Sequence, residues 1–226
     1  MHILLFDIDG TLIRSGGAGK AAMEGGLTDA FGITNIRDEV PYGGRTDGAI
    51  VRDLLRVHDI EVNAVNIEKL QRAYQTKLRE TLVTQKGEIC AGIPELLPKL
   101  RNSPNVTLGL LTGNVRGGAE NKLRHYDLWH YFPFGGFADD THDRSEVARR
   151  AVVEAEKHLG RDIDRNRIWV IGDTPHDVQC ARSIGVKAVA VGTGWHTMEE
   201  LAASKPDVLA KDLREAKELL REWGVD

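Results

Sequence analysis

The stretch HILLFDIDGT, residues 2–11, combines the apolar pattern of a buried strand with two aspartates near its end. From His2 to Ile8 the residues suit a buried β-strand, except that Asp7 interrupts the apolar run and Asp9 follows it. An unpaired carboxylate is expensive to bury, so two of them two residues apart need a partner that offsets their charge. We therefore expect a functional site where this strand ends.

Further apolar runs have the composition of buried parallel strands. The expected strands are residues 2–8, 106–112, 167–173 and 187–192, with a weaker one at 133–139 and a last strand–helix pair at 207–223. Helical spacing separates them over residues 115–126, 145–160 and 174–185. This alternation predicts an α/β protein with a doubly wound, Rossmann-like parallel sheet.

Residues 15–85 differ from the rest of the chain. They contain three helical patterns and no convincing strand. We interpret them as an α-helical insertion between the first two core strands, so that residues 1–14 and 86–226 form the core. Gly16, Gly17 and Gly19 are expected at hinge or loop positions.

Composition excludes several classes of partner. The net charge of −4 over 226 residues provides no broad basic field for nucleic acid or an anionic membrane. Cys90 and Cys180 lie far apart, which favours a reducing compartment. The first apolar run is interrupted by Asp7, unlike a signal peptide, and no run reaches the length of a membrane span. We expect a cytoplasmic monomer or homodimer.

Polar residues follow four of the expected strands. They are Asp7 and Asp9, the Thr112–Asn114 turn, the run 139–144 and the run 173–177. In a doubly wound sheet the carboxyl ends of the strands form the ligand site, so these carboxylates should converge. Two unit charges about 4 Å apart repel by about 4 kcal/mol at an effective dielectric near 20. A divalent cation relieves this repulsion, and oxygen ligands favour Mg²⁺.

Two further residues supply what a phosphate group requires. Thr112 offers a hydroxyl donor and Arg144 a cation for the remaining phosphate oxygens. Together with a magnesium site, they indicate phosphoryl transfer.

Most of these residues also have an ordinary structural interpretation. Residues 174–177 fit a helix start with a capping box, and Thr112–Asn114 fits a strand-to-helix turn. An arginine such as Arg144 is commonly a solvated surface residue. His142 and His176 are expected in a loop or a helix start rather than as ligands, because Mg²⁺ prefers oxygen. The carboxylate inside the first strand has no comparable alternative.

The motifs FDIDGTL (6–12), LLTGN (110–114) and GDTPHD (172–177), in this order, resemble the haloacid dehalogenase superfamily of hydrolases, in its phosphatase branch. The resemblance covers the whole chain, and the insertion resembles the family's cap domain, here residues 15–85. It implies a magnesium-dependent phosphatase acting on a small phosphorylated metabolite. The stretch GRTD (44–47) slightly resembles phosphoglycolate phosphatases.

The resemblance also implies catalytic roles. Asp7 would attack phosphorus and form an aspartyl-phosphate, and Asp9 would protonate the leaving oxygen and then activate water. Magnesium would be bound by Asp7, the backbone carbonyl of Asp9 and Asp173, with Asp177 supporting directly or through water. The presence of Asp9 argues against a dehalogenase, because a departing halide needs no proton.

The phosphate group is expected on Thr112, Gly113, Asn114 and Arg144. The family usually places a lysine before the helix that leads to GDxxxD, but no lysine lies between Lys122 and Lys157. Arg144 is the best substitute, since it can bind phosphate through two N–H groups. Arg149 and Arg150 compete for this role, but helical spacing directs them toward solvent.

The cap is expected to select the substrate through Lys20 and Arg45. In the alternative, Thr46 is a helix N-cap and Arg45 lies in water. Two other functions stay open at this point: a phosphomutase of the β-phosphoglucomutase type, and a catalytically silent binding module. Phosphonate hydrolysis fits less well, because that branch lacks the acid at the position of Asp9, and intact Asp7 and Asp9 disfavour the silent module.

Overall fold

A six-stranded parallel sheet forms the centre of the computed structural model, which describes residues 1–214 and 216–225. Across the sheet the order is β5 (Gly135–Gly136), β4 (Val106–Leu111), β1 (His2–Phe6), β6 (Ile168–Gly172), β7 (Lys187–Val191) and β8 (Val208–Ala210). All neighbouring strands in it pair in parallel. The predicted α/β class is confirmed.

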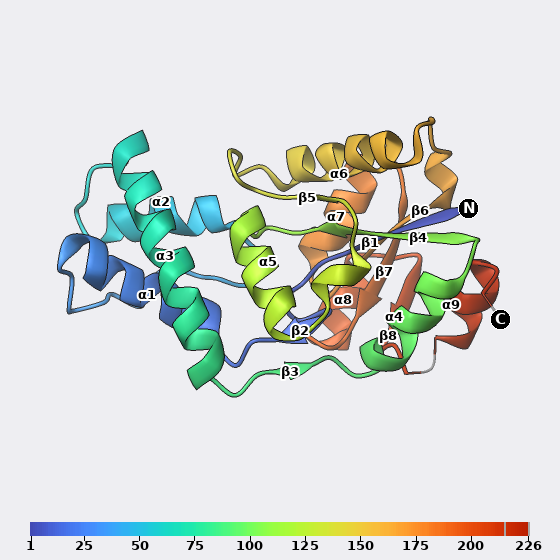
Figure 1. Cartoon of the computed structure of the whole chain (residues 1–226), viewed down its shortest axis with the longest axis horizontal. Helices are drawn as coiled ribbons and strands as arrows, with labels where there is room; N and C mark the ends of the chain where they lie inside the picture. The colour runs from blue at the N-terminus through green and yellow to red at the C-terminus, as the bar shows by residue number, and fades with distance from the viewer. Residues whose placement is uncertain (215, 226) are drawn as a thin grey trace.

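Helices cover both faces of the sheet (Figure 1). One face carries α4 (Ile93–Asn102), α5 (Arg116–His125) and α9 (Lys217–Glu222), and the other carries α6 (Arg144–Leu159), α7 (Pro175–Ser183) and α8 (Met198–Ala203). Single 3₁₀ turns lie at Trp129–Tyr131 and Arg165–Arg167. Strand β1 contributes to both layers because its side chains alternate: Leu4 and Phe6 join one apolar cluster, Ile3 and Leu5 the other.

Three helices lie between β2 (Ile13–Arg14) and β3 (Glu88–Ile89) along the chain and occupy one end of the molecule (Figure 1). They are α1 (Ala18–Phe31), α2 (Asp47–Val57) and α3 (Ala64–Thr84), and they bury a cluster of their own around Leu27, Leu54 and Tyr74. The division into domains at residues 15 and 85 stays a prediction.

Some elements were not expected from the sequence. Helix α4 contains two prolines, which weaken its helical pattern, and α8 is only six residues long. Strands β2 (Ile13–Arg14) and β3 (Glu88–Ile89) pair antiparallel, one before α1 and the other after α3. Each has only two residues, which is too few to show the alternation of apolar and polar residues that marks a strand in a sequence. The expected loop position of Gly19 is wrong, because α1 begins at Ala18.

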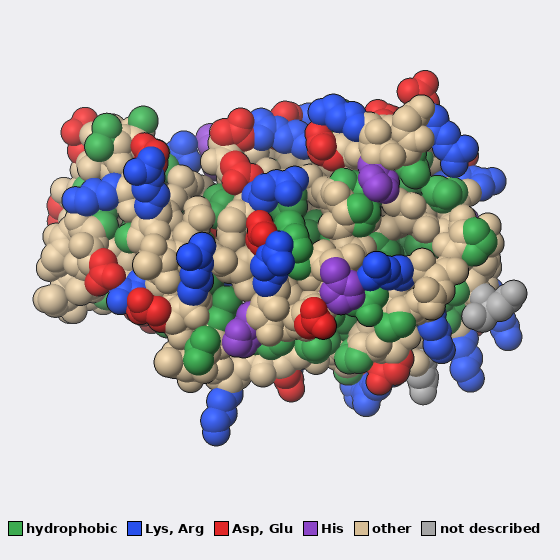
Figure 2. All heavy atoms as spheres, in the orientation of Figure 1, with side chains coloured by type: hydrophobic (Ala, Val, Ile, Leu, Met, Phe, Trp, Pro, Cys, Tyr) green, Lys and Arg blue, Asp and Glu red, His purple; other side chains and the backbone are tan. Residues whose placement is uncertain are grey.

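The surface carries both signs of charge. On the face in Figure 2, Lys and Arg side chains are interspersed with Asp and Glu. Among the described residues, no helix combines the length and apolar character that a membrane crossing requires.

Candidate active site

The loops after β1, β4 and β6 meet at one edge of the sheet because β1 pairs with both other strands. This is the switch point at which open α/β sheets bind ligands. The loop after β1 turns tightly at Gly10, whose φ of 84° favours glycine. A Cβ there would lie 2.2 Å from Oδ2 of Asp173, so only glycine allows the two loops to approach this closely.

Three buried carboxylates form the centre of the site. Asp7, Asp173 and Asp177 each offer an oxygen, and these oxygens lie within 4.8 Å of one another. Burial, followed by the charge of Asp177, raises the pKa of Asp7 to about 7. Burial with Asp177 and Asp7 raises the pKa of Asp173 well above its usual value. A closely packed all-carboxylate set is a suitable donor set for a hard divalent cation.

Asp177 is also part of a helix start. Its Oδ2 accepts hydrogen bonds from the backbone N–H and the hydroxyl of Thr174, at 3.0 and 2.8 Å. Its Oδ1 accepts from Nη2 of Arg144 at 2.5 Å. The helix-start interpretation of residues 174–177 is therefore correct, and it does not exclude the carboxylate cluster, because the same side chain takes part in both.

Arg144 begins α6 and reaches into the carboxylate cluster. Burial opposes its charged form, but the charges of Asp177 and Asp7 raise its pKa above the usual range. Its Nη1 donates to the carbonyl of Gly44 at 3.0 Å, whereas its buried Nε finds no partner among the described residues. These two contacts use only part of the fork of N–H donors that an arginine carries.

Arg149 and Arg150 take no part in this cluster. Their side chains are 53% and 38% exposed, and they pair with acidic residues along the surface of α6. The expectation that they face solvent is confirmed.

A second network surrounds Asp9. Its Oδ2 accepts from Nζ of Lys122 at 2.6 Å and from Nδ2 of Asn114 at 2.9 Å. Nδ2 of Asn114 also donates to Oγ1 of Thr112 at 2.8 Å, and its Oδ1 accepts from Lys122 at 2.7 Å. Both amide hydrogens of Asn114 are therefore used within the protein, while the Thr112 hydroxyl donates to no described residue.

The insertion closes onto this site through Asp47. Its backbone N–H donates to the carbonyl of Gly113 at 2.8 Å, and its Oδ2 accepts from the N–H of Val115 at 2.9 Å. A Cβ on Gly113 would lie 2.5 Å from the carbonyl oxygen of Arg45. Burial raises the pKa of Asp47 to about 6, although Lys122 acts against this.

A cavity of about 850 Å³ lies between the insertion and the strand ends. Asp7, Asp9, Thr112, Arg144 and Asp173 line one end of it.

Lys20 and Arg45, the residues expected to select the substrate, also line this cavity, and their role stays a prediction. Lys20 pairs with Asp38 at 2.6 Å, and Arg45 pairs with Asp53 at 2.5 Å. Thr46 is the N-cap of α2, as its alternative interpretation predicts, but Arg45 is held by Asp53 instead of lying in water.

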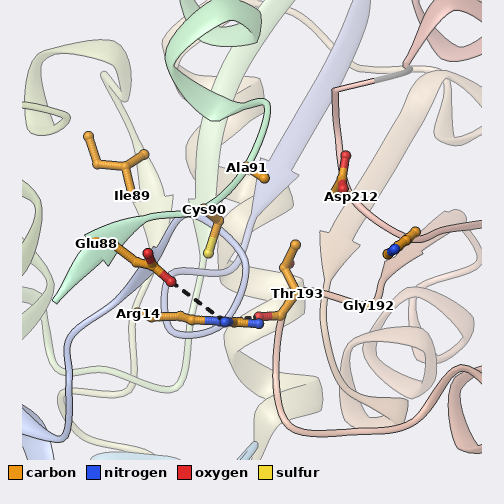
Figure 3. Close-up of a pocket in the computed structure, with 9 residues that line it drawn as sticks. Arg14, Glu88, Ile89, Cys90, Ala91, Gly192, Thr193 and Asp212 are labelled. Carbon is orange, nitrogen blue, oxygen red and sulfur yellow. Dashed lines mark hydrogen bonds and ion pairs between the residues drawn. The ribbon is translucent and has the colours of Figure 1, made fainter.

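A smaller cavity of about 260 Å³ adjoins the strands β2 and β3 (Figure 3). In it Arg14 donates from Nε to the carbonyl of Thr193 at 2.6 Å and lies 3.6 Å from a carboxylate oxygen of Glu88. Burial raises the pKa of the Cys90 thiol to about 12, so this sulfur is no nucleophile at neutral pH.

Comparison with known proteins now assigns the family. The sequence model of the haloacid dehalogenase-like hydrolases matches residues 4–191. The chain belongs to this family. The probable phosphatase IndB of Dickeya dadantii (strain 3937) is 28% identical over 221 residues, which cover 94% of this chain and 90% of that protein. A phosphoglycolate phosphatase of Synechococcus elongatus is 27% identical over 216 residues, 92% of each chain.

A solved structure agrees with the fold of this haloacid dehalogenase-like hydrolase. The crystal structure of CbbY from Rhodobacter sphaeroides in complex with phosphate has a TM-score of 0.77 at 17% identity and covers 96% of each chain. The prediction of an enzyme from the phosphatase branch of the haloacid dehalogenase-like hydrolases is confirmed.

Sequence reasoning missed Lys122 in this hydrolase. Its side chain is 5% exposed, and burial opposes its charge, but Asp9 and Asp47 raise its pKa above the usual value. A signal was present in the sequence: Lys122 follows Ala119 by three residues and precedes Leu123, both on the buried face of α5. An ammonium group on an apolar helix face needs a buried acidic partner.

Proposed function

We propose that this protein is a magnesium-dependent phosphatase that hydrolyses a small phosphorylated metabolite through an aspartyl-phosphate on Asp7. The observation that carries the proposal is the buried cluster of Asp7, Asp173 and Asp177 at the end of a large cavity. Asp9 and Arg144 line the same end of the cavity. The site therefore brings a nucleophile, an acid and a cation together around the place where a phosphoryl group would bind.

The reaction has two steps. In the first, a carboxylate oxygen of Asp7 attacks phosphorus, the bond to the leaving oxygen breaks, and Asp9 gives that oxygen a proton. In the second, Asp9 takes a proton from water, whose oxygen attacks phosphorus and frees Asp7 and phosphate. Oδ1 of Asp9 accepts no hydrogen bond from a described residue, so it is the oxygen left to exchange the proton.

The phosphate oxygens would be bound by the hydroxyl of Thr112, the guanidinium of Arg144 and the backbone N–H of Gly113, which all line the cavity. Asn114 would act by orienting Thr112 and Asp9, because its own hydrogens are already donated to them.

Magnesium would be held by Asp7, Asp173 and the backbone carbonyl of Asp9, with Asp177 in support. The raised pKa values of Asp7 and Asp173 agree with a buried site in which the single charge of Arg144 does not offset three carboxylates. The bound ion would keep these carboxylates ionised and polarise the phosphoryl group.

Magnesium should stabilise the fold measurably. We expect the Tm of the metal-free protein to rise on addition of millimolar MgCl₂, because the cation removes the repulsion among the three carboxylates. Asp173→Asn should lose this rise, while Asp162→Asn, a change at an exposed loop residue, should keep it. Differential scanning calorimetry measures both. An equal rise in the Asp173→Asn protein would remove Asp173 from the metal site.

Arg144 should act mainly on phosphate binding. Arg144→Lys keeps the positive charge beside Asp177 but loses the planar fork of donors, so we expect KM to rise about tenfold with a smaller change in kcat. Arg150→Lys, in a surface ion pair of the same helix, is the matched control. Steady-state kinetics that leave KM unchanged in Arg144→Lys would contradict the role.

The decisive experiment for the function is phosphate release from a panel of phosphorylated metabolites with and without Mg²⁺. Release that needs magnesium supports the proposal. Transfer of the phosphoryl group to a second hydroxyl of the sugar, without release, would favour the phosphomutase instead.

A further inference from the structure

The cavity that ends at Asp7 is much larger than a phosphate group needs. Its volume of about 850 Å³ lies in the range of pockets that hold drug-sized ligands. A two-carbon leaving group such as glycolate would leave most of it unfilled. On the basis of the proposed function, we propose that the leaving group carries a flat, uncharged aromatic ring that stacks on Trp195.

The cap side of the cavity offers little attraction for a second acidic group. Nζ of Lys20 lies 2.6 Å from Asp38, and the guanidinium of Arg45 pairs with Asp53 and also donates to the carbonyl of Pro41 at 3.1 Å. A substrate carboxylate would have to share these cations with the acids that already pair with them.

The other cationic side chains on the lining are also paired or solvated. Lys122 is held by Asp9 and Asn114, and Lys86 is exposed to water in the connection between α3 and β3. Arg14 lies 3.6 Å from Glu88, and His196 lies 3.3 Å from Glu200. Asp47 adds a buried acid to the wall. The end of the cavity away from the phosphate site therefore suits an uncharged group.

Apolar side chains make up much of the cap wall. Met23 from α1, Ile50 from α2 and Tyr74 from α3 line the cavity and are each less than 5% exposed, and the half-buried Tyr42 stands beside them. Burying an apolar ring against such a wall is favourable, because apolar surface is removed from water.

Trp195 stands on the core side of the same cavity. It is 93% exposed, whereas Trp169 and Trp223 are buried in the core. An indole this exposed at a pocket rim has uncovered ring surface, and aromatic rings stack well on such surface.

The loop that carries Trp195 is anchored to the catalytic end. Oγ1 of Thr193 donates to the carbonyl of Gly10 at 2.6 Å, and the Thr193 carbonyl accepts from Arg14 at 2.6 Å (Figure 3). A Cβ on Gly194 would lie 1.7 Å from Oδ2 of Asp173, so the loop is pressed against the carboxylate cluster. The backbone next to Trp195 is thus held close to the phosphate site.

The test compares two sugar phosphates, one with and one without an aromatic base, and a third compound, phosphoglycolate. Adenosine 5′-monophosphate and ribose 5-phosphate share the phosphate and the sugar carbon that carries it, and phosphoglycolate adds an acidic leaving group without a ring. We expect kcat/KM for adenosine 5′-monophosphate to exceed the other two by about tenfold or more. Equal values for the first two compounds, or a preference for phosphoglycolate, would overturn the proposal.

Variants of Trp195 locate the effect. Trp195→Ala should lower kcat/KM for adenosine 5′-monophosphate about tenfold, mainly through KM, and leave ribose 5-phosphate unchanged; Trp195→Phe should restore most of the loss. An equal loss for both compounds would mean that Trp195 serves the fold or a contact between subunits, and would overturn the proposal.

A binding measurement separates this inference from the proposed function. In the Asp7→Asn protein, adenosine 5′-monophosphate should quench tryptophan fluorescence, and adding Trp195→Phe should abolish the quenching. Quenching that persists without Trp195 would overturn the stacking. Release from ribose 5-phosphate without any preference for the ring would overturn the inference alone, whereas inactivity toward every compound would overturn the proposed function and the inference with it.

Discussion

Replacing Asp7 by asparagine is expected to lower phosphate release at least about a thousandfold, because the amide cannot form the aspartyl-phosphate. Asp162→Asn, the exposed control, should keep full activity. Activity is measured as phosphate released from the best substrate at saturating Mg²⁺. Near-normal turnover by a folded Asp7→Asn protein would show that another group is the nucleophile.

The same variant should be more stable than the natural protein at neutral pH without metal. The pKa of Asp7 is raised from 3.8 to about 7 by burial and by Asp177. At pH values between these two pKa values, Asp7 keeps its proton in the folded state but has released it in the unfolded state. The free energy of unfolding therefore falls as pH rises, by about 1.4 kcal/mol per pH unit.

Asparagine at residue 7 removes this dependence. Metal-free Asp7→Asn should therefore match the natural protein near pH 4 and exceed it by a growing margin up to about pH 7. Urea unfolding at several pH values measures the difference. A constant difference across this range would mean that Asp7 is ionised throughout.

Lys122→Met is the second change with a large expected effect. It leaves Asp47 buried without its cation and removes the group that holds Asp9. We expect a loss of about 1 to 3 kcal/mol in unfolding free energy, less than for a fully buried pair because the Asp9 side chain is 43% exposed. The value of kcat should fall on the order of a hundredfold, since Asp9 is no longer positioned as the acid.

Two controls make this prediction specific. Lys157→Met removes a lysine that is 67% exposed on α6 and should change neither quantity. Lys122→Arg retains the charge and should recover most of the stability. Because Lys122 acts through Asp9 and Asn114, KM should change little in Lys122→Met; a rise in KM with constant kcat would instead place Lys122 on the substrate.

The outcome for Arg45 illustrates what local sequence could and could not predict. That Thr46 caps α2 follows from neighbouring residues, since a cap involves a hydroxyl and an N–H three residues apart. The pairing of Arg45 with Asp53 depends on how the loop before α2 folds back over that helix. The sequence therefore placed Arg45 in a loop before a helix but did not predict that its charge is already paired with Asp53.

The sequence was enough to predict the α/β fold, the main strands as they follow one another along the chain, and the position of Asp7 and Asp9 at a strand end. This was possible because apolar runs, helical spacing and a carboxylate inside an apolar run are local properties. Only the tertiary structure decided that Lys122 holds Asp9, that Asp47 docks on Gly113 and that Trp195 stands open beside the cavity. These depend on which segments pack together, and the burial and charge of each side chain are determined by neighbours that lie far away along the chain.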